Sequence, residues 1–292
     1  MNILRLTGEP TGQPPVLIHA FAGFLDAGAA GRIAVAHMVD TLEHRQIGAF
    51  DIDLLFDYRG RRPRSTFLSD HYGEIEMPEL LLHELTDSHG QTFLVLQGPE
   101  PDLGWRAVRD EVMAMVTDWD IALVLGLQGV PFPAPHTRPV QVTAHGTDSS
   151  LIAGREPWVG DIEVPGSMSG LLELSLSAAG RTSLGFVAHV PHYLAAADYP
   201  SAAVRLIEEV SATTGLAIPL DGLREKAVEA DAEIGRQVAA DPDNMQVVRA
   251  LEEQLDGMLA ARAAEKGTAG AQVPSDEELA AQVERFLAEL DR

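Results

Sequence analysis

The sequence predicts an α/β protein whose mixed, mostly parallel sheet is flanked by helices and followed by a C-terminal α-helical appendage. Three apolar segments, residues 16–21, 93–96 and 121–125, each end in a glycine-containing turn. Strands that are apolar on both faces and alternate with helices are typical of parallel sheets covered on both sides. From Asp221 onward the chain is rich in alanine, glutamate and leucine at helical spacing. We therefore expect an α/β core over residues 1–218 and a helical extension over residues 219–292.

Periodicity and turn residues place the other elements. A helix over residues 27–43 follows the first strand, and Asp26 is well placed to cap it. Apolar residues recur at helical spacing over residues 103–119, which predicts a second helix. The remaining strands are expected at 50–56, 71–76, 80–86, 140–144 and 183–190, and the remaining helices at 171–179, 200–215, 223–239, 244–264 and 276–290.

Two further segments are defined by proline and by charge. Residues 71–76 and 80–86 flank Met77-Pro78, and we expect them to pair as antiparallel strands. Residues 131–139 contain four prolines, and each of them lacks a backbone donor, so this segment is expected to be a rigid loop. The turn over residues 57–64 holds four of the 21 basic residues of the chain.

Composition excludes several classes of function. The 292 residues carry 21 basic and 44 acidic side chains, a formal charge of −23. This charge opposes binding to nucleic acid or to an anionic membrane. The chain contains no cysteine, which excludes disulfides, thiolate metal sites and cysteine nucleophiles. It has neither an apolar secretory segment at its start nor the roughly 20 apolar residues that span a bilayer, so we expect a cytoplasmic protein.

Two turns lack the residue that their best-known chemistry requires. In the turn over residues 23–28 the glycines are five positions apart, as in a phosphate-binding loop, but Ala29 stands where such a loop needs lysine. In residues 166–170 Met168 occupies the position of the nucleophilic serine in a hydrolase elbow. The ten histidines show no metal-ligand spacing. We therefore predict no catalytic set, no metal site and no cofactor.

Polar side chains at the ends of the strands form the candidate pocket, because α/β folds collect functional groups there. A histidine would act in it as general acid or base, and Arg59 would hold an anion. Simpler structural interpretations stay open: Asp26 as a helix cap, Arg59 as part of a solvated turn, and each histidine as a hydrogen-bonded turn residue. The candidate residues are Asp26, Asp57, Arg59, Gln97, Gln128, His145 and His192.

Short motifs follow one another in a characteristic order over about residues 14–215: FLDAG at 24–28, DYR at 57–59, RP at 62–63, QGPEP at 97–101, GLQG at 126–129, PG at 165–166, GFVAHVPHY at 185–193 and YPSAA at 199–203. In this order they resemble the proteasome assembly chaperone 2 family in its long actinobacterial form. The resemblance implies an α/β core similar to that of purine nucleoside phosphorylases, without a demonstrated general enzymatic activity. It also implies a role beside the proteasome α-ring, whose assembly the eukaryotic and archaeal relatives assist.

We predict a non-catalytic protein-binding and assembly factor that self-associates, as a trimer by analogy with the phosphorylase-like scaffold. Proteasome subunits are the implied partner. Chaperone relatives often dock with a C-terminal hydrophobic-tyrosine-any tripeptide, and Leu290-Asp291-Arg292 stands there in this chain, so we expect it not to make that contact. The alternative is a small-molecule-binding protein or an enzyme acting on a nucleoside-like or carboxylated ligand in the candidate pocket.

Overall fold

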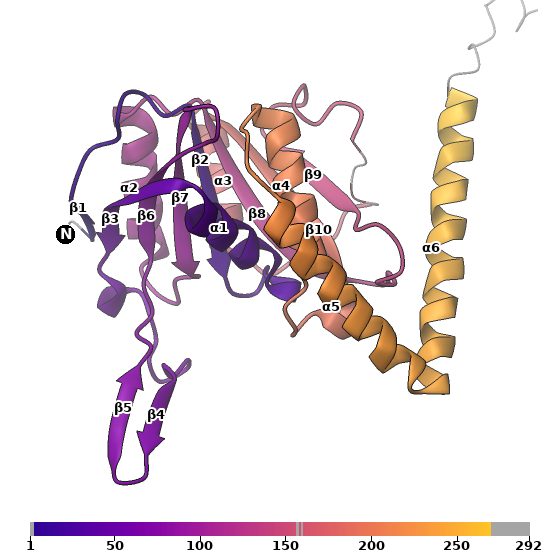
Figure 1. Ribbon diagram of the computed structural model, residues 1–292. Coiled ribbons are helices and arrows are strands. Elements are labelled where there is room, and N and C mark those ends of the chain that lie inside the picture. Colours follow the sequence, from indigo (N-terminus) through magenta and orange to yellow (C-terminus); the bar gives the residue numbers. More distant parts are fainter. Residues whose placement is uncertain (1–2, 156–157, 159, 270–292) are drawn as a thin grey trace, which may run out of the picture.

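The computed structural model describes residues 3–155, 158 and 160–269. An eight-stranded sheet in the order β1-β3-β6-β7-β2-β8-β10-β9 forms the centre of the protein (Figure 1). Two further strands, β4 and β5, pair with each other outside this sheet. The strands are β1 (Leu4–Leu6), β2 (Val16–Ala22), β3 (Glu43–Phe50), β4 (Ser65–Leu68), β5 (His71–Ile75), β6 (Leu81–Thr86), β7 (Thr92–Pro99), β8 (Leu123–Phe132), β9 (Val142–Gly146) and β10 (Thr182–Pro191).

The predicted mixed, mostly parallel sheet is confirmed. Strands β7, β2, β8 and β10 are parallel neighbours. Strand β6 is antiparallel to both β7 and β3, so β3 runs in the same direction as the four parallel strands. The remaining strands, β1 and β9, are antiparallel additions at the two edges of the sheet.

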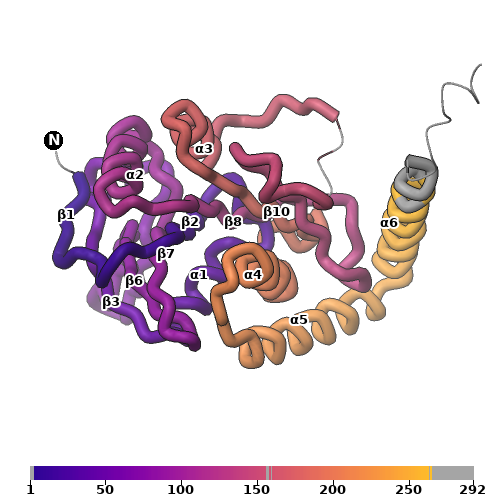
Figure 2. The backbone as a smooth tube through the Cα atoms, turned by 90° about the horizontal axis from the view of Figure 1, so that it is seen from above, coloured from indigo at the N-terminus to yellow at the C-terminus, as the bar shows by residue number. Residues whose placement is uncertain are grey.

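Helices cover both faces of the sheet, as Figure 2 shows from above. Helices α1 and α4 pack on one face, and α2 and α3 pack on the other. Helix α5 packs against α4 and leads into α6, which stands beside the body of the protein (Figure 1). The α-helices in the described part of the chain are α1 (Ala30–Thr41), α2 (Trp105–Asp118), α3 (Met168–Ala178), α4 (Pro200–Thr214), α5 (Asp221–Ala239) and α6 (Pro242–Ala269).

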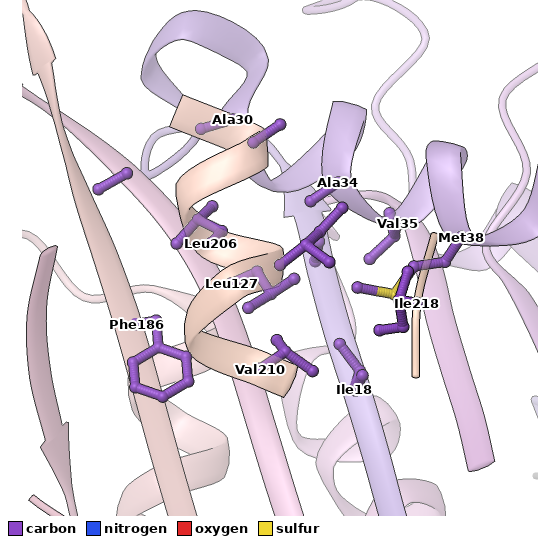
Figure 3. Close-up of a cluster of buried hydrophobic side chains, with 14 of the residues drawn as sticks. Ile18, Ala30, Ala34, Val35, Met38, Leu127, Phe186, Leu206, Val210 and Ile218 are labelled. Carbon is purple, nitrogen blue, oxygen red and sulfur yellow. The ribbon is translucent and has the colours of Figure 1, made fainter. Parts of the chain in front are cut away.

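The larger apolar core lies between the sheet and helices α1 and α4 (Figure 3). Ile18 from β2 and Phe186 from β10 are fully buried there. Met38 from α1 and Leu206 from α4 close over them and are also fully buried. Each side chain of this size contributes roughly 1.5–3 kcal/mol when it is removed from water. This burial holds the parallel strands and the two helices in one arrangement.

Small residues allow α1 to approach the sheet closely. A Cβ atom added to Gly31 would lie 2.6 Å from the carbonyl oxygen of Leu127, and one added to Gly129 would overlap the backbone of Ala27. A short 3-10 turn, Ala27–Ala29, leads into α1 and is buried. The run of small residues after β2 is therefore required by the contact between α1 and β8.

The second strand was predicted at the wrong place. Residues 50–56 contain a short 3-10 turn, Ile52–Leu54, while the strand is β3, Glu43–Phe50. The first half of β3 is polar and exposed, so its sequence lacks the apolar alternation that indicates a strand. Pairing with β6 places it in the sheet. Strand β8 also continues to Phe132, two residues into the segment expected to be an irregular loop.

The antiparallel pair predicted around Met77-Pro78 is wrong as well. Strand β5 pairs with β4, while β6 pairs with β3 and β7. The hairpin of β4 and β5 projects away from the sheet (Figure 1), and all of its strand residues are exposed. A strand without a buried face carries no pattern that defines its partner.

The helices predicted at 223–239 and 244–264 are present as α5 and α6, and the one predicted at 276–290 lies outside the described residues. The domain boundary between residues 218 and 219 stays a prediction. Leu223 of α5 packs in the same apolar core cluster as residues of the sheet. Among the helices of the described part, none combines the length and the apolar character needed to cross a membrane.

The substitution Gly31→Ala is expected to lower the free energy of unfolding by about 1–3 kcal/mol, because the added methyl meets the backbone of β8. The matched control is Gly235→Ala on α5, where nothing lies within 4 Å of the added atom. This control is expected to raise stability by roughly 0.5–1 kcal/mol. Urea unfolding followed by circular dichroism measures both, and equal effects of the two substitutions would contradict the close approach of α1.

Candidate functional site

A row of two histidines and two glycines crosses four neighbouring strands. His19 of β2 is in register with Gly126 of β8, Gly126 with Gly185 of β10, and Gly185 with His145 of β9. A Cβ atom on Gly126 would lie 2.8 Å from Cε1 of His19, and one on Gly185 would overlap the ring of His145. Each imidazole thus lies over a glycine, and the two rings face one another across the sheet.

His19 is the buried end of this row. Its side chain is almost inaccessible to solvent, and its Nδ1 atom has no hydrogen-bond partner among the described residues. Burial, together with the nearby His145, lowers the pKa of His19 to about 4. His19 is therefore neutral at physiological pH, with one ring nitrogen free to bind a polar group.

His145 is the accessible end, and it is oriented by a carboxylate. Its Nδ1 lies 2.7 Å from Oε2 of Glu173 on α3, and its side chain is 40% exposed. Helix α3 is itself anchored at its start, since the backbone N–H of Gly170 donates to Oγ of Ser167. The carboxylate on Nδ1 fixes the orientation of the ring, whose Nε2 edge lies against Gly185 of β10.

A third histidine, His189, lies on the same face, two strands from His19. Thr143 of β9 is 2.9 Å from Nε2 of His189 on β10, and the ring of Phe132 stacks on His189 at 4.2 Å between centroids. Burial, with a smaller effect of Arg262, lowers the pKa of His189 to about 4. The side chain of Trp158 packs edge-on against the same imidazole. This part of the sheet face covered by α2 and α3 is therefore lined by polar and aromatic side chains, whereas the rest of that face is apolar.

Two of the seven candidate residues belong to this face. His145 is in the row, and Gln128 lies two positions after Gly126 on β8 and is buried. Gln97 points to the opposite face, because it is in register with Ala20 of β2, the neighbour of His19. There it lines a cleft of about 390 Å³ beside α1.

The other candidates lie elsewhere. Asp57 and Arg59 form a tight turn, in which the N–H of Arg59 donates to Oδ1 of Asp57 at 2.9 Å. His192 begins a short 3-10 turn and lines a separate cleft of about 240 Å³ against α5 and α6. The chain does not bring the seven residues into one pocket. Within the described part, no group of three or more histidine, aspartate or glutamate side chains is placed to hold a metal ion.

Sequence reasoning missed His19 and Glu173. One available signal was a lone histidine inside an otherwise apolar strand. A second was the pair of glycines in the interiors of two apolar strands, since such glycines often mark the close approach of another group. Glu173 had no comparable signal, because its contact with His145 depends on how α3 packs on the sheet.

Asp26 has the capping role that its position suggests. Its Oδ1 accepts hydrogen bonds from the backbone N–H groups of Gly31 and Arg32, at 2.9 and 3.3 Å. Asp26 precedes the 3-10 turn, so it caps α1 from a distance in the sequence, while Ala29 is the residue next to the helix. Burial raises the pKa of Asp26 to about 6, against the smaller opposing effect of these two hydrogen bonds.

The raised pKa of Asp26 predicts a stability change between about pH 4 and pH 6. A carboxyl group with a higher pKa in the folded state binds more protons there, so its contribution to stability falls as the pH rises through this range and is constant above it. Asp26→Asn keeps the acceptor oxygen but does not titrate. Its stability relative to the wild type is therefore expected to increase from pH 4.5 to pH 7.5 in urea unfolding, and a pH-independent difference would contradict this.

A sheet covered by helices on both faces, with polar side chains between strand and helix, defines a doubly covered α/β protein. The chain belongs to the PAC2 family, whose model matches residues 20–238. A comparison with curated proteins found no match.

Solved structures agree with this assignment. The chain is 41% identical to the Mycobacterium tuberculosis protein Rv2714, described as of unknown function, over 91% of this chain and 92% of that one, with a TM-score of 0.88. It is 26% identical to the proteasome-assembly chaperone homologue Rv2125 of the same organism, over 80% of this chain and 99% of that one, with a TM-score of 0.72. PbaB, an archaeal proteasome activator from Pyrococcus furiosus, is 17% identical, covers 81% of this chain and 98% of its own length, and shares the fold with a TM-score of 0.61.

Proposed function

We propose that this protein is a non-catalytic, chaperone-like assembly factor that binds other proteins and self-associates, with a trimer as the expected assembly. Membership in the PAC2 family supports it, as does similarity to Rv2125, which is described as a proteasome-assembly chaperone homologue. The observation that carries the proposal is the exposed apolar hairpin of β4 and β5. Proteasome subunits are the proposed partners.

The hairpin exposes large apolar side chains at its tip and along its length. Phe67 is 59% exposed and Tyr72 is 76% exposed, and their rings meet at 5.1 Å between centroids. Leu68, Ile75 and the nearby Met77 are also exposed. An isolated two-stranded hairpin is only marginally stable in water, and clustered exposed apolar side chains mark interaction surfaces. A protein surface that covers this hairpin would stabilise the two strands and would remove the apolar side chains from water.

The segment that leads into β4 carries four arginines in a strongly acidic protein, while Glu74 and Glu76 lie on the returning side of the hairpin. Arg61 pairs with Asp102 at 2.8 Å, but no ion pair forms at Arg59, Arg62 or Arg64 within the described part of the chain. The chain as a whole has a charge of −23. An acidic surface, such as that of a second copy, would therefore complement the arginines of residues 59–64. This charge distribution supports self-association through the hairpin.

The double substitution Phe67→Asp with Tyr72→Asp is expected to convert the oligomer into monomers, because it places charge on the apolar tip. Light scattering after size-exclusion chromatography measures the mass. Val228→Asp is the matched control, since Val228 is 69% exposed on α5 and away from the hairpin. An unchanged mass of the double variant, with the fold intact by circular dichroism, would contradict the proposed interface.

The chaperone role is tested with purified proteasome α-subunits. The protein is expected to co-migrate with them on a native gel and to increase the rate at which they assemble. The hairpin variant separates self-association from partner binding in the same assay. If the wild type neither co-migrates nor alters the assembly rate, the proteasome part of the proposal fails.

A second candidate function is the binding or conversion of a nucleoside-like or carboxylated small molecule. The row of His19, Gly126, Gly185 and His145 favours it, since Nδ1 of His19 is buried without a hydrogen-bond partner among the described residues and Glu173 orients His145. A ligand at 100 times its dissociation constant adds roughly 2.7 kcal/mol to stability. In a thermal-shift screen, a nucleoside or a small carboxylic acid that binds is expected to raise the Tm of the wild type but not that of His145→Ala. Equal shifts in both proteins would exclude His145 from the site.

A further inference from the structure

The cleft of about 390 Å³ beside α1 lies at the base of the hairpin of β4 and β5. It is lined by Met77, which follows the hairpin, by Val35 of α1, and by Ala22 and Gln97 near the ends of β2 and β7. Most of its lining residues are apolar. The histidine row lies on the other face of the sheet. The cleft is therefore a separate feature, and it is open to the surface where the hairpin begins.

Part of the wall of this cleft is formed by close contact between backbone segments. Gly98 near the end of β7 has a φ of 155°, and a Cβ atom added to it would lie 2.3 Å from the carbonyl oxygen of Glu79. The chain that returns from the hairpin thus lies directly against β7. Because only glycine permits this contact, the wall does not depend on one side-chain rotamer.

The polar groups at the cleft do not suit a small ion. Arg32 already pairs with Asp198 at 2.9 Å, so its charge is balanced. Glu79 adds one exposed carboxylate, whereas a divalent cation needs several oxygen ligands. An apolar lining with a few polar groups at its edge is instead typical of a site for an apolar or aromatic group.

The same chain carries an aromatic group that lacks a covering surface. The rings of Phe67 and Tyr72 meet near the tip of the hairpin, and both side chains are mostly exposed. The four residues of β4 span roughly 13 Å, and the hairpin is directed away from the sheet (Figure 1). The tip therefore cannot reach the cleft of its own chain, but the tip of a second copy can.

Charged side chains at the tip and at the cleft entrance complement each other. Asp70 at the tip is 86% exposed and contacts His71 of the same tip. The carbonyl oxygen of Arg64 accepts a hydrogen bond from the backbone N–H of Glu76 at 2.9 Å, which places Arg64 beside Met77 at the entrance. Arg64 is exposed and forms no ion pair within the described part of the chain. A carboxylate brought by a second copy would pair with it.

We propose that the hairpin tip of one copy, with Phe67 and Tyr72, inserts into this cleft of a second copy and brings Asp70 beside Arg64 there. The inference rests on the self-association proposed above and names the surface that receives the hairpin. An aromatic side chain buries roughly 150–250 Å² when it is covered, so the two rings are the expected anchor. The contact joins two different surfaces, so three copies in a closed ring would each give one hairpin and receive one.

Cross-linking between copies tests the contact, and the absence of native cysteine removes any background. His71→Cys places a thiol at the tip and keeps both aromatic rings, while Met77→Cys places one at the cleft. The two variants are co-expressed with different affinity tags, purified through both tags and treated with a short bis-maleimide. A covalent dimer that carries both tags is expected on a denaturing gel. Neither variant alone is expected to give a dimer.

The matched control pairs His71→Cys with Leu174→Cys. Leu174 is 73% exposed on α3, which covers the other face of the sheet, so no cross-link is expected. An oligomer by light scattering, without a cross-link above this control, would overturn the inference and leave self-association standing. A dimer from His71→Cys alone would place tip against tip and would also overturn it. A monomeric mass would overturn both and would assign the hairpin to a different protein.

Charge reversal provides a second readout that introduces no thiol. Arg64→Glu and Asp70→Lys are each expected to weaken self-association by about fivefold, as expected for the loss of an exposed ion pair. The two substitutions combined in one chain are expected to restore the wild-type affinity, because the pair is re-formed with its signs exchanged. Arg249→Glu makes the same charge change at an exposed position of α6 and is expected to have no effect. The dependence of the mass on protein concentration measures all four variants. A combined variant as weak as the single ones would overturn the pairing of tip and cleft.

Discussion

The hydrogen-bond register of β2, β8 and β10 is the constraint on which the rest of the structure depends. Side chains alternate between the two faces of a strand, so a slip of one residue would exchange the faces completely. Leu17 and Ile18 are both fully buried, on opposite faces of β2. Each face is therefore matched to its own helices. The same register aligns His19 with Gly126 and Gly185 and leaves room for an imidazole over each glycine.

Burial determines which polar side chains of this protein are neutral and which are charged and paired. His19 and His189 lose solvent and are kept neutral, because an imidazolium ion would be unstable beside an apolar core. Arg155, in contrast, stays paired with Glu209 of α4. Within the described part of the chain, the buried side-chain atoms without a hydrogen-bond partner include Nδ1 of His19 and Oδ1 of Asp231. Leaving such an atom without a partner lowers stability.

The hairpin of β4 and β5 differs from the sheet in the exposure of its apolar side chains. The sheet derives its stability from two apolar cores, whereas the hairpin exposes its apolar residues. The proposed assembly role needs an exposed surface to which a partner can bind. In that proposal the hairpin is the surface that binds the partner, and the body of the protein carries it. This division of roles connects the fold with the proposed assembly function.

The amino-acid sequence alone determined the α/β class, the central parallel strands and the helical character of the chain after Asp221. Those elements have a repeating apolar pattern that is local to each segment. It also supported the family, because the motifs have a recognisable order. The position of β3, the presence of β4 and the pairing of β5 were decided by tertiary structure. Strands β4 and β5 are short and exposed, the first half of β3 is polar and exposed, and such segments carry no apolar pattern of their own. The grouping of His19 with His145 and Glu173, and the separation of Gln97 from Gln128, also required the folded sheet. Which side chains meet depends on strand register and helix packing, and neither is encoded within one segment.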